Sequence, residues 1–199
     1  MERRRGRGMR LADIRQVLAG FQPGRMDEVP EASKAAVAAV LRENLEGVEL
    51  LFIHRAEHPH DPWSGHVGFP GGRVDPADGG LLAAAVRETR EELGVDLERV
   101  AELIGRLSEV RTHLGSRAVP RSVVPFVFAL RGEMAVVPNV EVQQVLWVPL
   151  AFLLDQRNRS TMVWVRRGVP LPTPSYRFQG HVIWGLTLRF VDELLSILR

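Results

Sequence analysis

Residues 71–95 decide the fold of this 199-residue chain and read GGRVDPADGGLLAAAVRETREELGV. Residues 81–93 contain no glycine or proline, and Gly94 follows where the C-cap of a helix is expected. We therefore predict a helix over residues 81–93. The glycine pair at 71–72, preceded by Phe69-Pro70, predicts a tight turn whose backbone can approach a metal ion or a phosphate closely.

The predicted helix carries three carboxylates on one face. Glu88, Glu91 and Glu92 stand at i, i+3 and i+4, so their side chains repel one another unless a cation lies between them. A hard divalent cation such as Mg²⁺ or Mn²⁺ takes oxygen ligands of this kind. The alternative is a solvated acidic face. We expect the helix to bury an apolar stripe that consists of Leu82, Val86, Thr89 and Leu93.

Hydrophobic patterning predicts the elements around this helix. The predicted strands are residues 34–41, 48–54, 121–130, 141–148, 161–165 and 176–178. The predicted helices are residues 10–20, 149–155 and 184–198, with loops over 22–33, over 57–80 and through the Pro-rich segment between 165 and 176. Because strands precede and follow one central helix, we predict an α/β layered domain with a mixed sheet.

Composition indicates a globular protein with one main domain. The hydrophobic share is 45% and the charged share 25%, which excludes a disordered chain. Residues 1–25 hold seven arginines and two acids, a balance of +5, whereas the rest of the chain, with 19 basic and 22 acidic residues, has a balance of −3. We therefore divide the chain into a basic tail with a short helix (1–25) and a single domain (26–199).

Several function classes are excluded by residues that the sequence lacks. With no cysteine, the chain has no disulfide, thiol nucleophile or iron–sulfur ligand. No apolar run reaches the roughly 18 residues that span a bilayer, and no apolar segment follows the basic N-terminus as in a secretory signal. We expect a cytoplasmic protein with no membrane partner. The basic tail has no aromatic residue before Phe21, so we favour a solvated end over a nucleic-acid partner.

At this point the residues resemble a known family. Residues 87–95, RETREELGV, match the second half of the Nudix box, REUxEExGU, in which U is a bulky apolar residue. In the first half, Gly72 is followed by Asp78 in place of the usual Glu, and the spacing to Arg87 is one residue longer. This variant resembles the coenzyme A pyrophosphatase branch of the Nudix hydrolases.

An upstream signature of that branch, roughly LLTxR[SA]x3Rx3Gx3FPGG, is also recognisable. The matching positions are Leu51, Arg55, Ala56, Gly65 and residues 69–72, FPGG. His60 stands where the branch has an arginine, and the stretch that follows is one residue longer. Near the C-terminus, residues 183–187, IWGLT, resemble a further segment of the branch, so that the resemblance covers residues 34–198.

The resemblance implies an α/β/α sandwich with a mixed β-sheet and a loop–helix–loop metal site. It implies that Glu88, Glu91 and Glu92, with the Gly71 carbonyl, hold Mg²⁺ or Mn²⁺, and that Arg87 and Asp78 orient them. The implied reaction is hydrolysis of a nucleoside diphosphate linked to another moiety, here coenzyme A or a derivative. The products from coenzyme A would be 3′,5′-ADP and 4′-phosphopantetheine.

Other candidate residues complete the expected site. We assign Glu91, Arg87 and Glu141 to catalysis, with Glu141 as a candidate general base at the start of its strand. The candidate substrate-binding residues are Arg55, His60, His66 and Arg73. The spacing of His58, His60, Asp61 and His66 fits no zinc pattern, so this loop is expected to contact the substrate or to have no role.

Two rival functions stay open. One is a Nudix pyrophosphatase for ADP-ribose, dinucleotides or nucleoside triphosphates, which the His60 replacement and the longer loop keep in play. The other is a non-catalytic Nudix-like binding or regulatory module. We expect a small nucleotide pyrophosphate as partner, no nucleic acid, and leave a homodimer open.

Overall fold

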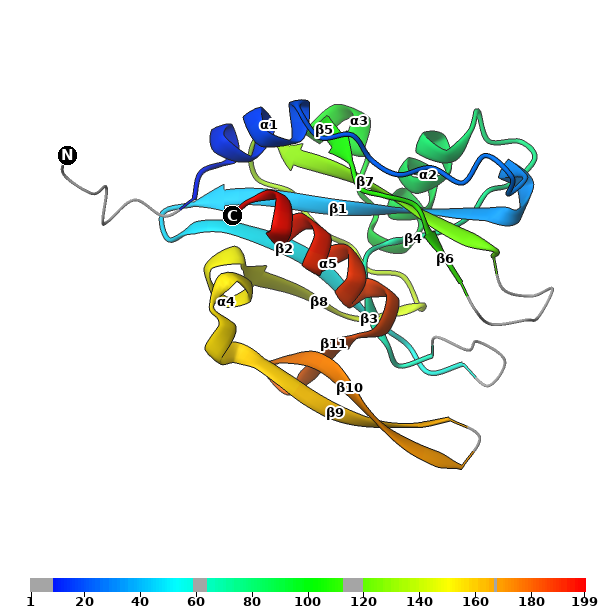
Figure 1. Ribbon diagram of the computed structural model, residues 1–199. Helices are drawn as coiled ribbons and strands as arrows, with labels where there is room; N and C mark the ends of the chain where they lie inside the picture. The colour runs from blue at the N-terminus through cyan, green and yellow to red at the C-terminus, as the bar shows by residue number, and fades with distance from the viewer. Residues whose placement is uncertain (1–8, 59–63, 113–119, 167) are drawn as a thin grey trace.

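The computed structural model describes residues 9–58, 64–112, 120–166 and 168–199 of the chain. The predicted solvated tail over residues 1–8 and the candidate His60 lie outside the described residues. Two sheets and the helices that cover them make up the fold (Figure 1). Within the described part of the chain, no helix is both long and apolar enough to cross a bilayer.

The larger sheet is mixed, as predicted. Its main path runs β3 (Val67–Gly68), β2 (Gly47–Arg55), β1 (Lys34–Asn44), β7 (Ser122–Leu130) and β5 (Ala101–Arg106). Three further strands pair with it, namely β4 (Gly71–Arg73) with β1, β6 (Val110–Arg111) with β7, and β8 (Val142–Pro149) with β2. Strands β1 and β7 run parallel, and the other pairs are antiparallel.

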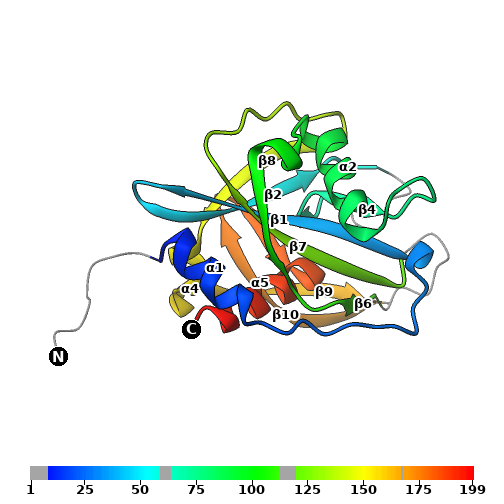
Figure 2. The same cartoon turned by 90° about the horizontal axis from the view of Figure 1, so that it is seen from above.

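Helices cover both faces of the large sheet, which gives the expected α/β/α layering. Helices α2 (Leu81–Leu93) and α3 (Leu97–Val100) lie on one side, and α1 (Leu11–Ala19) and α5 (Gly185–Ile197) lie on the other (Figure 2). All nine residues of β7 are buried, because a central strand covered on both faces has no polar side to expose. The short helices α4 (Leu150–Leu154), η1 (Glu31–Ser33) and η2 (Gln156–Asn158) complete the set.

The site lies where β1 and β2 separate. The two strands pair only through their hairpin ends, Leu41 with Leu50 to Asn44 with Gly47. Toward its start, β1 pairs instead with β4, and Val37 lies opposite Gly71. Strand β4 therefore takes the place beside β1 that β2 leaves, and it brings Gly71 and Gly72 beneath α2. The predicted turn is corrected in one respect: the chain bends at Pro70, and both glycines already lie in the strand.

The Pro-rich segment is a strand, which corrects the predicted loop. Strand β10 (Val169–Phe178) pairs with β9 (Arg159–Arg166) and β11 (His181–Trp184) in a three-stranded sheet. Its prolines stand at every second position, 170, 172 and 174, and β11 pairs only with residues 175–178. Proline lacks an N–H but is tolerated where one strand edge faces no partner. The predicted helix over 184–198 begins one residue later, since Trp184 ends β11.

The segment over residues 57–80, predicted to be mostly loop, contains the short strands β3 and β4. Strand β5 had no predicted counterpart. Its register with β7 shifts between Leu103 and Gly105, and Leu103 is 44% exposed. A bulge of this kind breaks the alternation that marks a strand in a sequence.

Candidate active site

Helix α2 carries the acidic face at its C-terminal end. It ends at Gly94, which adopts the left-handed conformation with a φ of 68° and donates its N–H to the Arg90 carbonyl at 2.9 Å. At the other end Gly80 offers no side-chain cap, and the Glu31 carboxylate instead accepts the Leu81 N–H at 3.0 Å. A carboxylate from 50 residues upstream thus stabilises the positive end of the helix dipole.

The apolar stripe predicted for this helix is partly wrong. Thr89 and Leu93 are fully buried, but Leu82 is 37% exposed. Ala84 and Ala85 are buried instead, since small side chains let the helix lie close to the sheet. Thr89, a weak match to the apolar position of the box, satisfies its buried hydroxyl by donating to the Ala85 carbonyl at 2.7 Å.

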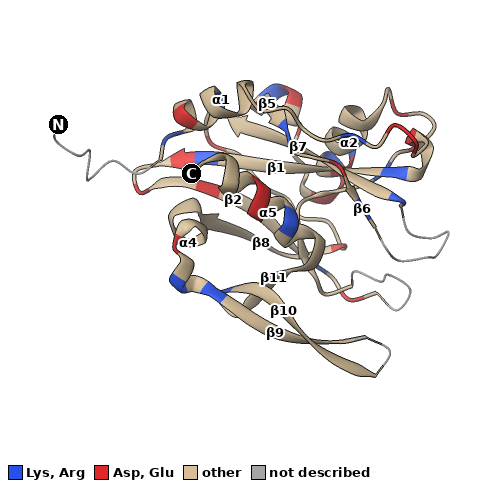
Figure 3. Ribbon diagram, viewed as in Figure 1, with Lys and Arg blue, Asp and Glu red and all other residues tan. Residues whose placement is uncertain are grey.

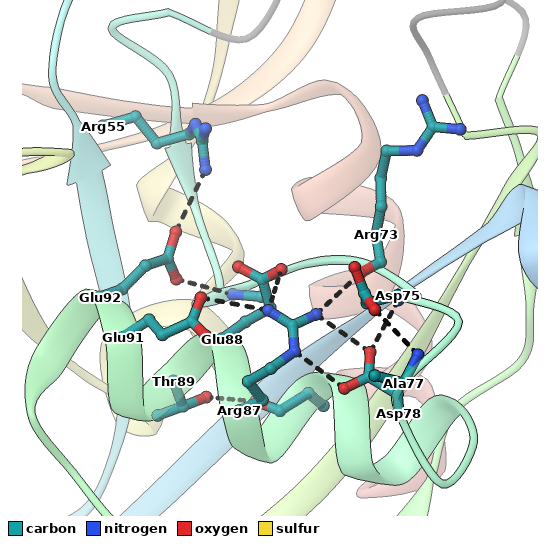
Figure 4. Close-up of polar contacts among 12 residues, drawn as sticks. Arg55, Arg73, Asp75, Ala77, Asp78, Arg87, Glu88, Thr89, Glu91 and Glu92 are labelled. Atoms are coloured by element: carbon teal, nitrogen blue, oxygen red, sulfur yellow. Dashed lines mark hydrogen bonds and ion pairs between the residues drawn. The ribbon is translucent and has the colours of Figure 1, made fainter.

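The three carboxylates have different surroundings. Glu92 is 2% exposed and accepts hydrogen bonds from the Gly71 N–H at 2.8 Å and from Arg55 Nη1 at 3.3 Å. The Glu91 side chain is 53% exposed, and Glu88 lies between these extremes. Figure 4 shows Glu92 directed toward Arg55 and Glu91 directed toward Arg87.

Arg87 joins the helix to the preceding loop. Its Nε and Nη2 donate to the two carboxylate oxygens of Asp78 at 2.8 and 3.0 Å. Its Nη1 donates to Glu88 at 2.9 Å and to Glu91 at 3.1 Å, and Nη2 also donates to the Arg73 carbonyl at 3.0 Å (Figure 4). Arg87 lies four residues before Glu91, a spacing at which the two side chains can meet on one face of a helix, and that contact is present. Through these bonds one guanidinium holds two of the three carboxylates in place.

The two glycines of the turn are required by close packing. Gly71 has a φ of 144°, and a Cβ there would lie 2.3 Å from the Ala36 carbonyl oxygen on β1. A Cβ on Gly72 would lie 2.4 Å from Cδ of Glu88. The Glu88 carboxylate therefore occupies the space above Gly72 that any side chain would fill. Because both residues lack a side chain, the backbone at Gly71 and Gly72 lies against β1 on one side and against the Glu88 carboxylate on the other.

Burial and neighbouring negative charges favour the protonated forms of Glu88 and Glu92. Burial is the largest cause that raises the pKa of Glu92 to about 8, and the charges of Glu88 and Glu141 contribute in the same direction, against the Gly71 N–H and Arg55. Burial also raises the pKa of Glu88, which the hydrogen bond from Arg87 opposes. The hydrogen bonds from Arg87 hold the pKa of Asp78 below its ordinary value.

Glu141 lies beside this cluster. It is exposed, its carbonyl oxygen accepts the Ala56 N–H at 2.8 Å, and its charge acts on both Glu88 and Glu92. It comes just before β8 rather than inside the strand. The structure thus brings the candidate base close to the helix carboxylates, although its catalytic role stays a prediction.

The donor set fits a hard divalent cation, but the described side chains are not yet arranged around one. Among residues 9–58, 64–112, 120–166 and 168–199, no three His, Asp or Glu side chains gather at one point as a metal site. Instead, Arg55 and Arg87 pair with the carboxylates. Burial is the main cause of the raised pKa values of Glu88 and Glu92, and a bound cation would favour the charged form of both carboxylates.

A pocket of about 290 Å³ adjoins the glycine turn. Three of the four candidate substrate-binding residues, Arg55, His66 and Arg73, line it together with Gly71 and Gly72. The structure therefore gathers these residues although they come from β2, the segment before β3, and β4. Figure 3 marks charged residues on and around α2, while most residues of the β9–β10 hairpin are uncharged.

Sequence analysis singled out residues 183–187, which contribute to the opposite wall of this pocket, but it found neither the rest of that wall nor the cap of the helix. The wall consists of Ala35, Val37, Val67, Gly68, Phe69, Pro120, Val123, Trp184, Gly185, Leu186, Thr187 and Phe190. These residues come from distant segments, so no local pattern joins them. The sequence shows that Gly80 has no side chain to cap α2, but it does not show that Glu31 takes this role.

Comparisons with known proteins point to one family. The family model described as NUDIX domain matches residues 32–169. The chain is 33% identical over 170 residues to the human protein named mitochondrial coenzyme A diphosphatase NUDT8, covering 83% of this chain and 71% of that protein. It is 32% identical over 132 residues to a Photorhabdus laumondii protein named uncharacterized Nudix hydrolase NudL, covering 66% and 67%.

A crystal structure of a Caenorhabditis elegans Ap4A hydrolase binary complex is also similar, with 25% identity and a TM-score of 0.47. The match covers 59% of this chain and 80% of that one. The chain belongs to the Nudix hydrolase family, by the family model and by its relatives. It is accordingly a Nudix pyrophosphohydrolase, an enzyme that acts on phosphorus-containing acid anhydrides, in a family that generally uses divalent metal ions.

Proposed function

We propose that this enzyme hydrolyses the diphosphate bond of coenzyme A or its derivatives to 3′,5′-ADP and 4′-phosphopantetheine. The observation that carries the proposal is the pocket beside the box, which Arg55, His66 and Arg73 line together with the two glycines of the FPGG segment. The human relative at 33% identity, whose name gives coenzyme A diphosphatase activity, supports the same substrate.

Mg²⁺ or Mn²⁺ is the proposed cofactor, with Glu88, Glu91, Glu92 and the Gly71 carbonyl as its ligands. Carboxylate and carbonyl oxygens suit both ions, and the buried Glu92 and half-buried Glu88 have raised pKa values that a bound cation would reverse. When bound, the ion supplies charge neutralisation on the phosphoryl oxygens and a water of lowered pKa.

The chain's own residues have three tasks in this reaction. Arg55 and Arg73 line the pocket and pair with the oxygens of the diphosphate, which lowers the repulsion between it and an attacking water. Arg87, fixed by Asp78, keeps Glu88 and Glu91 in position. Glu141 accepts the proton from the attacking water, since it is exposed beside the carboxylate cluster.

A substrate panel tests this proposal. Purified protein with Mg²⁺ or Mn²⁺ is assayed against coenzyme A, ADP-ribose, a dinucleotide and a nucleoside triphosphate, and kcat/KM is compared. The proposal expects coenzyme A to have the highest kcat/KM. A higher value for ADP-ribose, a dinucleotide or a triphosphate would select the rival pyrophosphatase. Binding without turnover of any compound would select the non-catalytic module.

A further inference from the structure

The pocket beside the glycine turn has two chemically different sides. Arg55, Arg73 and the Gly71-Gly72 backbone form the side next to the carboxylates. The opposite side is apolar and consists of Val67, Phe69, Trp184, Leu186 and Phe190. A diphosphate fits the first side by charge. The second side must therefore contact what is joined to the diphosphate, because one pocket holds both.

The apolar side is built on buried packing and keeps its shape. Phe69 and Phe190 are 6% and 2% exposed, and their ring centroids lie 6.5 Å apart. Phe69 also stacks on Phe52 of β2, with centroids 5.1 Å apart. Side chains locked in the core in this way form a wall that is present before any ligand arrives.

Trp184 is the residue of this wall whose ring contacts the rings of His66 and Trp164. It ends β11, and Gly185, with a φ of 63°, turns the chain into α5 directly after it. The His66 ring lies 4.9 Å from the indole at an interplanar angle of 65°, and the Trp164 ring lies 5.7 Å away at 54°. The indole is half-buried and lines the pocket, so part of it is open to a ligand.

The chemistry of this side favours an aliphatic ligand over a base or a sugar. A buried base or sugar leaves several donors and acceptors to satisfy, and each one left unpaired is costly. Among the described residues that line this side, Thr187 is the one with a hydroxyl, and it already donates to the Val67 carbonyl at 3.0 Å. The part of pantetheine next to the diphosphate, a methylene and a carbon with two methyl groups, makes no such demand, and its contact with an indole is favourable. The hydroxyl and the two amides of pantetheine need not be buried against that ring.

We propose that Trp184 is a specificity-determining residue, which packs against an aliphatic arm joined to the diphosphate and so separates coenzyme A from nucleotides that carry a sugar or a second nucleoside. This inference rests on the proposed function, because the pantetheine part of coenzyme A is the arm in question. The adenosine part lies outside the Trp184 wall, and His66 and Trp164 hold the indole in place.

Binding measurements test the role of Trp184 without turnover. Glu92→Gln is used as the background, and calorimetric titration in Mg²⁺ compares coenzyme A, 4′-phosphopantetheine and 3′,5′-ADP. Adding Trp184→Ala is expected to weaken binding of coenzyme A and 4′-phosphopantetheine about tenfold, equal to about 1.4 kcal/mol, and to leave 3′,5′-ADP unchanged. Trp184→Phe keeps an aromatic wall and should lose less. It also serves if the alanine variant does not fold.

The matched control is Trp147→Phe. Trp147 is a half-buried tryptophan on β8 that stacks with Arg42 at 4.0 Å and does not line this pocket, so all three affinities should stay unchanged. Unaltered coenzyme A affinity in both Trp184 variants would overturn the inference. So would an equal loss for 3′,5′-ADP, because the indole would then hold adenine.

The same data separate this inference from the proposed function. The unsubstituted enzyme could fail to hydrolyse coenzyme A while Trp184→Ala still weakens binding of the pantetheine-bearing ligands selectively. The proposed reaction would then be wrong and the proposed role of Trp184 correct. If coenzyme A is hydrolysed and the Trp184 variants bind all three ligands as tightly as the background variant does, the reaction is correct and the role of Trp184 is wrong.

Discussion

Arg87 binds both carboxylate oxygens of Asp78, with Nε at 2.8 Å and Nη2 at 3.0 Å. The same guanidinium reaches Glu88 and Glu91 through Nη1. Asp78 is thus the anchor of the arginine that orients two proposed metal ligands. Its side chain is 6% exposed, so the pair is shielded from competing water.

Asp78→Asn should lower kcat by roughly 10- to 100-fold, the range typical of residues that support metal ligands. The amide can no longer accept two hydrogen bonds from Arg87, so Glu88 and Glu91 lose their fixed partner. Steady-state kinetics with and without added Mg²⁺ measure the loss. Asp75→Asn is the control, because Asp75 is exposed and its Oδ1 accepts the N–H of Ala77 within the loop, a bond that the amide oxygen of asparagine can also accept. Equal activity in both variants would contradict this role of Asp78.

Gly72→Ala should reduce activity on the order of 100-fold, because the new methyl group displaces the Glu88 carboxylate that now lies 2.4 Å from the Cβ position. Thermal unfolding should change little by comparison, since a partly exposed carboxylate can move away. Gly79→Ala is the matched control in the same loop, where the nearest atom is 3.9 Å from the Cβ position. Full activity of Gly72→Ala would show that the position of Glu88 does not matter.

Glu31→Ala should destabilise the protein by about 1 kcal/mol, the usual cost of a lost helix cap. For a domain of this size the melting temperature should fall by about 2–4 °C. The reason is that the Leu81 N–H at the start of α2 loses its acceptor. Glu28→Ala removes an exposed ion pair with Arg111 and should change the melting temperature far less. Identical melting temperatures for the two variants would exclude the cap.

Stability without metal should depend on the protonation of Glu92. Its pKa is about 8 in the folded protein against an ordinary value of 4.5, so between these pH values the folded state holds a proton that the unfolded chain has released. The free energy of unfolding therefore falls as pH rises from 5 to 8. Melting curves in EDTA should show this decline, and Glu92→Gln should reduce its slope. An unchanged slope in that variant would contradict the assignment to Glu92.

The sequence predicted the central helix and its carboxylates well because both depend on local spacing. The helix bounds, the Gly94 cap and the contact of Arg87 with Glu91 agree with the structure. Local spacing could not distinguish the three acids, since the burial of Glu92 comes from β4, whose Gly71 N–H binds it. That contact joins segments 21 residues apart.

The remaining differences also have tertiary causes. Strand β10 forms through alternate prolines because its other edge is open there, which no local propensity indicates. Leu82, expected inside, is exposed because Ala84 and Ala85 take the closest approach to the sheet. The pocket wall around Trp184 draws on β3, β11 and α5, so only the folded chain brings its residues together.

The most direct test of the central claim is to identify the products formed from coenzyme A. Purified protein with Mg²⁺ is incubated with coenzyme A, and the products are separated by chromatography and then identified and quantified by mass spectrometry. Glu92→Gln is the inactive control. We predict equal amounts of 3′,5′-ADP and 4′-phosphopantetheine, formed by the unsubstituted enzyme and not by the variant. Intact coenzyme A after prolonged incubation with Mg²⁺ or Mn²⁺, or the same products from Glu92→Gln, would contradict the account.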